Sequence, residues 1–437
     1  MKTPVDFSIA QDIIKSFNIP DFGKATIREV VAISNQIEKQ TGVEFVHMEM
    51  GVPGLPPAQV GVDAEIDALQ KGVAAIYPLI DGIPELKYES SRFVKAFVDL
   101  DIPARCCVPV VGSMQGTFTS FLVCGQCHKE KDTVLFIDPG FPVQKQQITV
   151  LGYKYESFDV YNYRGDKLKD ILTSYLEKGN IAAIIYSNPN NPAWFCLNEE
   201  ELKIIGEAAN QYDVIVLEDL AYFAMDFRKD MERPFEAPFQ ASVGRYTDNY
   251  LLLISGSKAF SYAGQRIGVV CISEKLYDRA YSGLTERYGV GGTFGSVFIH
   301  RALYAISSGT SHSAQYALAA MFKAASDGKY NFLEDVKEYG RRAEKLKAIF
   351  LKNDFKIVYD KDLDEPIANG FYFTIAYPGM TGGELMKALI FYGISAISLT
   401  TTGSSQEGLR ACTSFIKQHQ YALLEERLKV FKDNNPI

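Results

Sequence analysis

The sequence predicts an α/β fold with a mostly parallel, seven-stranded sheet covered by helices, followed by a smaller α+β unit. Between about residues 105 and 270, short apolar runs alternate with helical patterns, which is typical of a sheet with crossover helices. The runs are apolar on both faces, so we expect helices on both sides of the sheet. The seven runs are Cys107–Val111, Thr133–Ile137, Lys154–Phe158, Ile181–Tyr186, Val214–Leu217, Tyr250–Ile254 and Gly268–Ile272.

Helical patterns at about residues 275–325 lead away from this sheet, through a glycine-rich loop at Val290–Ser296. The smaller unit then begins with an amphipathic helix at Tyr330–Lys352. Its further elements are strands at Gly370–Tyr377, Ser395–Leu399 and Leu409–Phe415, and helices at Gly383–Tyr392 and His419–Phe431. At the start of the chain, one or two helices precede a short strand at Phe45–Met50, which ends in a loop rich in glycine and proline.

Length and charge restrict the class of protein. A chain of 437 residues is too long for one ordinary core. The net charge of -8 argues against a sequence-independent nucleic-acid binder, which needs a basic face. No stretch is long and apolar enough to span a bilayer, and the first residues lack a signal-peptide core. We therefore expect a cytoplasmic protein that binds neither nucleic acid nor membrane.

The seven cysteines are scattered through apolar segments and indicate buried reduced thiols. Cys124-Gly-Gln-Cys127-His128 matches the attachment pattern of a c-type haem, but it ends an apolar, helix-like run in a chain without an export signal. We interpret the match as coincidence. No second Cys/His pair has ligand spacing, so no metal site is expected.

The strongest chemical signal is Ser255-Gly-Ser257-Lys258, which directly follows the run Tyr250–Ile254, with Arg266 eight residues further on. A lysine kept from full solvation loses its proton more readily and can form a Schiff base. Arg266 and the two serine hydroxyls can hold a dianionic phosphate. The combination suits a phosphorylated carbonyl compound, of which pyridoxal phosphate is the obvious example. The alternative is an ordinary surface lysine in a Gly/Ser turn.

Other polar segments follow the predicted strands at the edge where such sheets bind ligands. The residues after the first run enter a helix and offer free backbone N–H groups to an anion. The four segments are Gly112-Ser-Met-Gln-Gly116, Asp138-Pro-Gly-Phe141, Ser187-Asn-Pro-Asn-Asn191-Pro192 and Glu218-Asp219-Leu-Ala-Tyr222. Late in the chain, Arg410 lies in an apolar strand, where its partner is either a structural carboxylate or a substrate carboxylate.

In this order the motifs resemble the class I/II aminotransferases, which are fold type I pyridoxal-phosphate enzymes related to aspartate aminotransferase. The resemblance covers nearly the whole chain and includes Gly-x-Pro at Gly51 and the late Leu-Arg pair at Arg410. It implies an N-terminal segment (1–60) that joins the small domain, a large cofactor-binding domain (61–325) and a C-terminal small domain (326–437). It also implies transfer of an amino group from an α-amino acid to a 2-oxo acid.

The resemblance implies three catalytic residues. Lys258 holds pyridoxal 5'-phosphate as a Schiff base and then moves the proton as general base and acid. Asp219 pairs with the pyridine nitrogen and keeps it protonated, so that the ring accepts electrons. Tyr222 and Asn191 hydrogen-bond the phenolic oxygen of the ring, while Phe141 stacks on its face.

The resemblance also implies a phosphate site, a substrate clamp and a shared dimer. Arg410 grips the substrate α-carboxylate beside the backbone of Gly51 and near Asn191. Tyr77 matches a tyrosine that reaches the phosphate from the neighbouring subunit, which implies a homodimer with shared active sites. The remaining phosphate ligands are the backbone N–H groups of Ser113, Met114 and Gln115 and the side chains of Ser255, Ser257 and Arg266.

Two features depart from the family pattern. Pro192 is followed by Ala-Trp194, where the family commonly has Thr-Gly, so the only tryptophan lies near the pocket and either shapes it or packs behind it. A second arginine for a dicarboxylate substrate is not evident, with Arg287 as the candidate. Two alternatives stay open: a carbon-sulfur β-lyase or other eliminating enzyme on the same scaffold, and a regulatory protein that binds pyridoxal phosphate.

Overall fold

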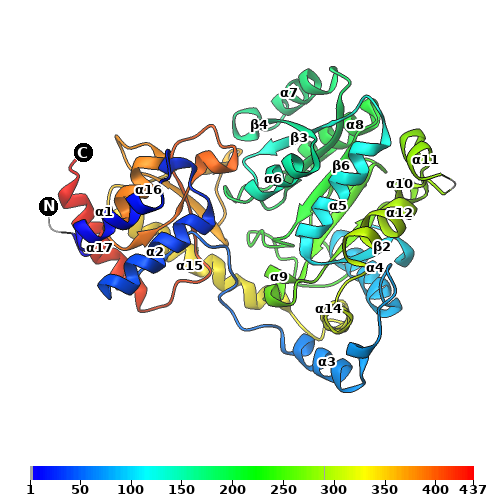
Figure 1. Ribbon diagram of the computed structural model, residues 1–437, viewed down its shortest axis with the longest axis horizontal. Coiled ribbons are helices and arrows are strands. Elements are labelled where there is room, and N and C mark those ends of the chain that lie inside the picture. The colour runs from blue at the N-terminus through cyan, green and yellow to red at the C-terminus, as the bar shows by residue number, and fades with distance from the viewer. Residues whose placement is uncertain (1–2, 290) are drawn as a thin grey trace.

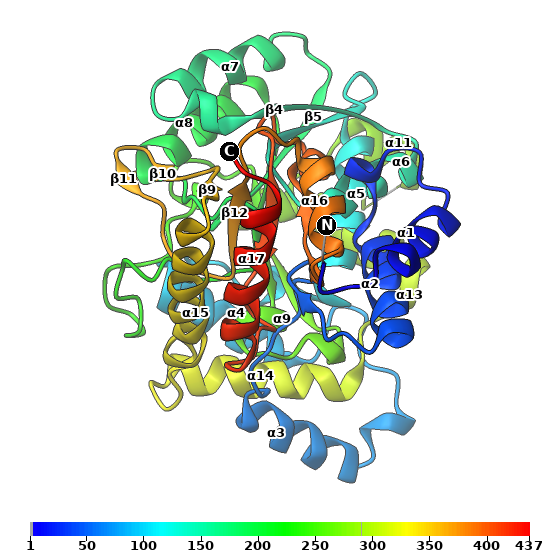
Figure 2. The same ribbon diagram turned by 90° about the vertical axis from the view of Figure 1, so that its left-hand side faces the viewer.

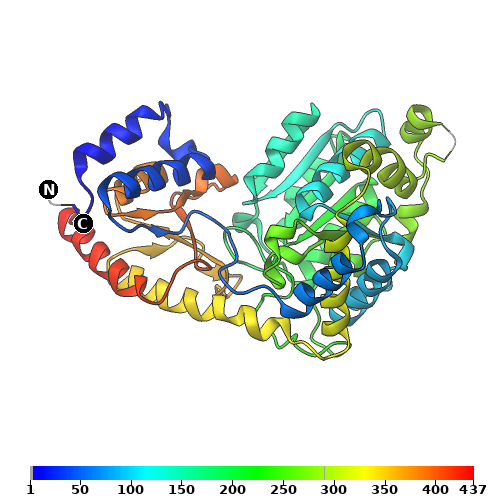
Figure 3. The same ribbon diagram turned by 60° about the horizontal axis from the view of Figure 1, so that its bottom comes forward.

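The structure is a computed structural model, and it describes residues 3–289 and 291–437. Figure 1 shows two lobes, of which the larger contains the main sheet and the smaller contains the first and last helices of the chain. Helix α15 (Phe332–Lys352) runs along both lobes (Figure 3). Its first residues, Phe332 and Leu333, pack in the core of the larger lobe, whereas Leu346 and Phe350 pack in the core of the smaller. The domain limits at residues 60 and 325 stay a prediction.

The main sheet has seven strands in the order β2-β8-β7-β6-β5-β3-β4, which confirms the predicted α/β class. All strands are parallel except β8, which is antiparallel to both of its neighbours. The strands are β2 (Cys107–Val110), β3 (Thr133–Asp138), β4 (Lys154–Asp159), β5 (Ile181–Ser187), β6 (Ile215–Leu220), β7 (Tyr250–Ser255) and β8 (Gly268–Ile272).

Neighbouring residues of each strand point to opposite sides of the sheet, and each side is covered by a hydrophobic core. In β7, Leu252 and Ile254 face one hydrophobic core, and Leu251 and Leu253 face another. The expectation that every strand is apolar on both faces is wrong for β4, whose first two residues are exposed because β4 is an edge strand. The covering and connecting helices are α3 (Gln59–Gln70), α4 (Pro84–Val98), α5 (Gly112–Cys127), α6 (Pro142–Leu151), α7 (Lys167–Leu176), α8 (Glu199–Tyr212), α9 (Gly256–Ala259), α10 (Glu274–Asp278), α11 (Ser282–Tyr288), α12 (Phe294–Val297), a π-helix (Phe298–Leu303), α13 (Tyr304–Ser307) and α14 (His312–Ser326).

The smaller lobe combines the two ends of the chain around one hydrophobic core. Strand β1 (Val46–His47) pairs in parallel with β13 (Ile394–Ser395), and this pairing ties the N-terminal segment to the C-terminal part. Figure 2 shows α1 and α2 beside α16, with α17 and α15 next to one another. The elements are α1 (Phe7–Ser16), α2 (Ile27–Thr41), β9 (Lys356–Ile357), β10 (Lys361–Asp362), β11 (Glu365–Pro366), β12 (Tyr372–Ala376), α16 (Gly382–Ile390), β14 (Ile397–Ser398), β15 (Leu409–Cys412) and α17 (Gln420–Asn434).

Several predicted elements differ in extent from the observed ones. The strand predicted at Ser395–Leu399 is divided, because Ser395 pairs with β1 whereas Ile397 pairs with β15. The strand predicted at Phe45–Met50 is reduced to β1, and the one predicted at Leu409–Phe415 ends at Cys412. In the glycine-rich loop, Val290 lies outside the described residues, and α12 already begins at Phe294.

The cysteine motif lies inside a helix. Cys124 and Cys127 belong to the last turn of α5, where both side chains are buried. Burial raises the pKa of both thiols. Neither thiol is accessible at the surface, which agrees with the interpretation of the haem-like pattern as coincidence. Among residues 3–289 and 291–437, no helix is long and apolar enough to cross a membrane.

Candidate active site

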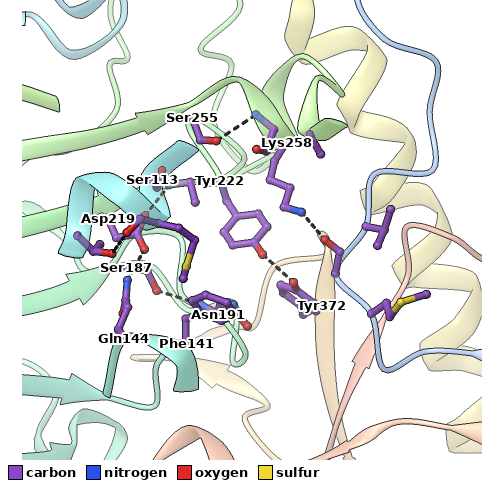
Figure 4. A pocket seen from close by; sticks show the side chains of 18 of the residues that line it. Ser113, Phe141, Gln144, Ser187, Asn191, Asp219, Tyr222, Ser255, Lys258 and Tyr372 are labelled. Atoms are coloured by element: carbon purple, nitrogen blue, oxygen red, sulfur yellow. Dashed lines mark hydrogen bonds between the residues drawn. The ribbon is translucent and has the colours of Figure 1, made fainter. Parts of the chain in front are cut away.

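A cavity of about 360 Å³ lies where the carboxyl ends of the parallel strands meet the smaller lobe (Figure 4). The predicted site residues reach it from different segments, and all of them except Gln115 and Tyr77 line it. Those that do are Gly51, Ser113, Met114, Phe141, Asn191, Asp219, Tyr222, Ser255, Ser257, Lys258, Arg266 and Arg410. Within the described ranges, no cluster of three or more His, Cys, Asp or Glu side chains could hold a metal ion.

Lys258 lies in α9, directly after β7, and its side chain enters the cavity (Figure 4). Its Nζ donates a hydrogen bond to the backbone carbonyl of Gly51. Burial lowers the pKa of Lys258 to about 8, and the positive charges of Arg266 and Arg410 act in the same direction. The amine is therefore far easier to deprotonate than a surface lysine, which is the property required of a nucleophile or general base.

Asp219 is the buried acid of the site and follows Glu218 near the end of β6. Burial raises its pKa to about 6, although two hydrogen bonds oppose that shift. The Ala221 N–H donates to Oδ1 at 3.1 Å, and Gln144 Nε2 donates to Oδ2 at 2.8 Å. Gln144 lies on α6, one turn after Phe141, so the same loop and helix place both residues against the cavity.

Tyr222 and Tyr372 join the two lobes across the cavity. Their hydroxyl groups lie 2.7 Å apart and share a hydrogen bond (Figure 4). Burial raises the pKa of Tyr372 to about 12 and holds that of Tyr222 well above its ordinary value, so both hydroxyls keep their protons at neutral pH. The indole of Trp194 packs edge-on against Tyr222 with ring centroids 5.3 Å apart. Trp194 is fully buried and does not line the cavity, so it packs behind the site.

Arg410 is a buried cation without a carboxylate partner. Its side chain is 1 % exposed, and its guanidinium lies 4.8 Å from the ring centroid of Tyr372. Nη1 donates to Asn191 Oδ1 at 3.4 Å, Nη2 donates to the Glu49 carbonyl at 2.5 Å, and Nε has no hydrogen-bond partner. No ion pair joins Arg410 to an acidic side chain in the part of the chain that the structure describes. Because a buried charge is costly unless it is paired, this arrangement calls for an anionic ligand.

A second candidate anion site lies at the start of α5. The Ser113 hydroxyl is buried without a hydrogen-bond partner. Gly112 has a φ of 66°, and a Cβ at this position would lie 2.7 Å from Arg266 Nη2, so only glycine leaves room for the guanidinium. Ser255 Oγ accepts the Ser257 N–H at 3.0 Å. Free helical N–H groups, an unpaired hydroxyl and Arg266 together fit a phosphate group.

Three other predicted residues lie away from the cavity. The Gln115 side chain accepts the Val111 N–H at 2.8 Å and donates to Ser307 Oγ at 2.8 Å. Tyr77 is 91 % exposed and borders a surface hollow near Ser307. Arg287 is an exposed residue of α11 and does not line the cavity. The proposed roles of Gln115 as a backbone donor, of Tyr77 in a neighbouring subunit and of Arg287 stay predictions.

Sequence reasoning missed part of the lining. Gln144 and Tyr372 lie in segments that carried a signal, one turn after Phe141 and near the start of the strand predicted at Gly370–Tyr377. Nothing in the sequence marked their side chains as facing the cavity. The other missed residues are Ile27, Met50, Val52, Thr117, Ser187, Ala221 and Ala263.

Comparison with known proteins agrees with this geometry. The family described as aminotransferase class I and II matches residues 44–425. An aspartate aminotransferase of Sulfolobus acidocaldarius is 24% identical over 249 residues, which are 56% of this chain and 59% of that protein. An LL-diaminopimelate aminotransferase of Natranaerobius thermophilus is 25% identical over 262 residues, which are 59% of this chain and 64% of that protein. The alignments thus span about three fifths of the curated relatives.

The fold extends the likeness over almost the whole chain. The crystal structure of an aspartate aminotransferase from Thermotoga maritima superposes with a TM-score of 0.74 at 18% sequence identity, and the match covers 96% of this chain and 99% of that one. An alanine aminotransferase from Pyrococcus furiosus has the same TM-score at 17% identity, with 94% and 97% covered.

Proposed function

Because the chain belongs to the class I and II aminotransferase family, we propose that it is a pyridoxal-phosphate-dependent aminotransferase, which moves an amino group from an α-amino acid to a 2-oxo acid. The observation that carries this proposal is that one cavity contains two groups: Lys258, whose pKa is lowered to about 8, and the buried Arg410, which forms no ion pair with an acidic side chain of the described residues. A deprotonated amine and a carboxylate receptor are the two groups that an enzyme acting on α-amino acids needs.

The residues present fit the cofactor. Its phosphate would take the free hydroxyl of Ser113 and the guanidinium of Arg266, together with Ser255 and Ser257. Its ring nitrogen would meet the buried carboxylate of Asp219, whose orientation Gln144 fixes. When bound, pyridoxal phosphate supplies an aldehyde that reacts with amines and an electron-withdrawing ring.

The protein side chains position the substrate and move its proton. Arg410 binds the α-carboxylate in a bidentate pair and thereby fixes the direction of the Cα–H bond. Lys258 Nζ, with its lowered pKa, takes and returns a proton near neutral pH. The Tyr222 hydroxyl, held by Tyr372, is a neutral donor to an oxyanion in the same cavity.

We also propose a homodimer. Tyr77 is 91 % exposed in the single chain and matches the family tyrosine that reaches the phosphate of the neighbouring subunit. A second copy would therefore complete the phosphate site. Sedimentation of the purified protein tests this, and Tyr77→Phe would weaken cofactor binding without changing the lysine chemistry.

The test of the function is an absorption spectrum of the cofactor-loaded protein during addition of single amino acids. Transamination predicts that the visible band disappears with suitable donors and returns when a 2-oxo acid is added. Unchanged absorbance combined with release of ammonia and a 2-oxo acid would instead establish a carbon-sulfur β-lyase or another eliminating enzyme. A protein that binds the cofactor but converts no amino acid would be the regulatory alternative.

A further inference from the structure

A buried cluster of three polar side chains lies outside the cavity, at β1 and β13 of the smaller lobe. Its centre is Glu49, which is fully buried. Glu49 Oε1 accepts a hydrogen bond from His47 Nδ1 at 2.8 Å, and Oε2 accepts one from Ser395 Oγ at 2.7 Å. None of these three residues lines the cavity, so the proposed function does not account for them.

The carboxylate of Glu49 has its counter-ion in the same chain. His47 Nε2 lies 3.4 Å from Glu38 Oε2 of α2, so the imidazole lies between two carboxylates. Burial lowers the pKa of His47, but the hydrogen bonds and negative charges of Glu49 and Glu38 outweigh burial and raise that pKa above its ordinary value. Glu49 and Ser395 are fully buried within the single chain, so the cluster does not depend on a neighbouring subunit.

The backbone at Glu49 connects this cluster to the cavity. The Glu49 carbonyl accepts the hydrogen bond from Arg410 Nη2 at 2.5 Å. Two residues further on, the Gly51 carbonyl accepts the hydrogen bond from Lys258. One short segment thus contacts both the basic group assigned to the substrate carboxylate and the reactive amine.

Backbone hydrogen bonds fix this segment only as far as Met48. The Met48 N–H donates to the Ser395 carbonyl at 2.8 Å, and the Met48 carbonyl accepts the Cys412 N–H at 2.8 Å. From Glu49 to Gly51, no residue forms a backbone–backbone hydrogen bond with any other residue that the structure describes. The buried side chain of Glu49 is therefore the anchor that fixes the position of the two carbonyls.

We propose that Glu49, held by His47 and Ser395, is a positioning residue that fixes the carbonyl by which Arg410 is oriented toward the substrate carboxylate. The inference rests on the proposed function and goes beyond it, because it assigns a role to residues outside the cavity. A guanidinium pairs with a carboxylate through two parallel hydrogen bonds, which require a defined orientation. A shift of the Glu49 carbonyl therefore weakens the binding of the α-carboxylate.

The test uses the cofactor-loaded protein and the amino acid that reacts fastest with the wild type. Glu49→Gln keeps the size of the side chain but places an amide N–H₂ group against one of the two donors. Its kcat/KM for the half-reaction should fall by about 10–100-fold with unchanged cofactor affinity, since a displacement of about 1 Å can cost about 10²-fold. Glu201→Gln is the matched control, because Glu201 is also fully buried and pairs with a basic side chain, that of Arg164. It should lower the stability and leave kcat/KM unchanged.

A double-mutant cycle separates positioning from a merely structural role. In the Arg410→Gln background, Glu49→Gln should lower kcat/KM further by less than about twofold, because the group that it orients is absent. Ser395→Ala removes one of the two donors to Glu49, so it should show the same dependence on Arg410 with a smaller loss, and it replaces Glu49→Gln if that protein does not fold. Equal losses in both backgrounds, or an unchanged kcat/KM, would overturn the inference and leave the proposed function standing. Failure of the wild type to react with any amino acid would overturn both.

Discussion

Gly51 should tolerate no side chain, because its backbone lies directly against the hydroxyl of Tyr372. A Cβ at position 51 would lie 2.0 Å from that oxygen, whereas unstrained contacts measure about 3.5 Å. In Gly51→Ala, Tyr372 must therefore retreat by about 1.5 Å. The same hydroxyl is 2.7 Å from the hydroxyl of Tyr222, so the movement also breaks a buried hydrogen bond between the two lobes.

The expected magnitude follows from these two effects. Overpacking of a buried site costs about 1–3 kcal/mol, and loss of the hydrogen bond adds about 1 kcal/mol. Tyr372→Phe alone leaves the Tyr222 hydroxyl unpaired and costs about 1–3 kcal/mol. In Gly51→Ala combined with Tyr372→Phe, the clashing oxygen is absent and the next ring atom lies 3.1 Å from the new Cβ. The double variant should thus lose about 1–2 kcal/mol less stability than the sum of the losses in the two single variants.

Urea denaturation of the cofactor-free protein measures these stabilities, and the four proteins form a double-mutant cycle. The matched control is Gly264→Ala near the cavity, where a new Cβ meets nothing within 4 Å. That control should leave the unfolding midpoint almost unchanged. Strict additivity of the two single variants, or a Gly51→Ala protein as stable as the Gly264→Ala control, would show that a side chain at position 51 does not clash with the Tyr372 hydroxyl.

Three further predictions concern the titrating and charged groups. Burial holds the pKa of Lys258 at about 8. The rate at which the cofactor-free protein takes up cofactor should therefore rise about tenfold per pH unit below pH 8 and level off above it. A rate that keeps rising to about pH 10 would contradict this prediction. Gln144→Leu removes a hydrogen bond that stabilises the charged form of Asp219, so the pKa of Asp219, about 6, should rise. The acid limb of the pH profile of kcat should then move to higher pH. Gln147→Leu on the same helix is the control and should not move that limb, because Gln147 bonds to the Met114 carbonyl instead. Arg410→Gln should lower kcat/KM for the amino acid by about 10²–10³-fold and leave the cofactor affinity unchanged. Arg410→Lys should recover part of the loss. Weakened cofactor binding in both variants would show that Arg410 binds the cofactor and not the substrate carboxylate.

The pH dependence of stability follows from the same lysine. The folded pKa of Lys258 is about 8 and its ordinary value is 10.5, so the unfolded chain binds the proton more tightly. Between pH 8 and pH 10.5 the folded chain has lost this proton, whereas the unfolded chain still binds it. The contribution of Lys258 to the free energy of unfolding therefore rises as the pH increases from 8 to 10.5. At neutral pH and below, the buried amine opposes folding until an anion or a covalent partner neutralises its site.

Local patterns were sufficient to predict the sheet. The structure confirms all seven predicted runs as strands within a few residues, including Lys154–Phe158, which is the least apolar of them and forms the edge strand β4. The position of Lys258 and Asp219 at strand ends also followed from order along the chain, because parallel strands bring their carboxyl ends to one edge. The pairing of the short strands in the smaller lobe was not predicted. Ser395 and Ile397 each pair with a different strand, which no local pattern records.

Contacts between distant side chains could not be predicted from the sequence. Gln144 reaches Asp219 across 75 residues, and Tyr222 reaches Tyr372 across 150. For Arg410 the sequence left two explanations open, a structural carboxylate or a substrate carboxylate. Only the three-dimensional arrangement shows that no acidic side chain of the described residues pairs with it. The position of Ile27 at the cavity was missed for the same reason, since it depends on where the N-terminal segment meets the larger lobe.

We propose Lys258 as the residue that binds the cofactor covalently. The most direct measurement is borohydride reduction of the cofactor-loaded protein, followed by mass-spectrometric mapping of the modified lysine. Lys347 is a suitable internal comparison, because burial lowers its pKa to about 8 as well, although it does not line the cavity. We expect modification of Lys258 alone, and no modified lysine in Lys258→Ala. Modification of Lys347 or of another lysine instead, with Lys258 unmodified, would contradict it.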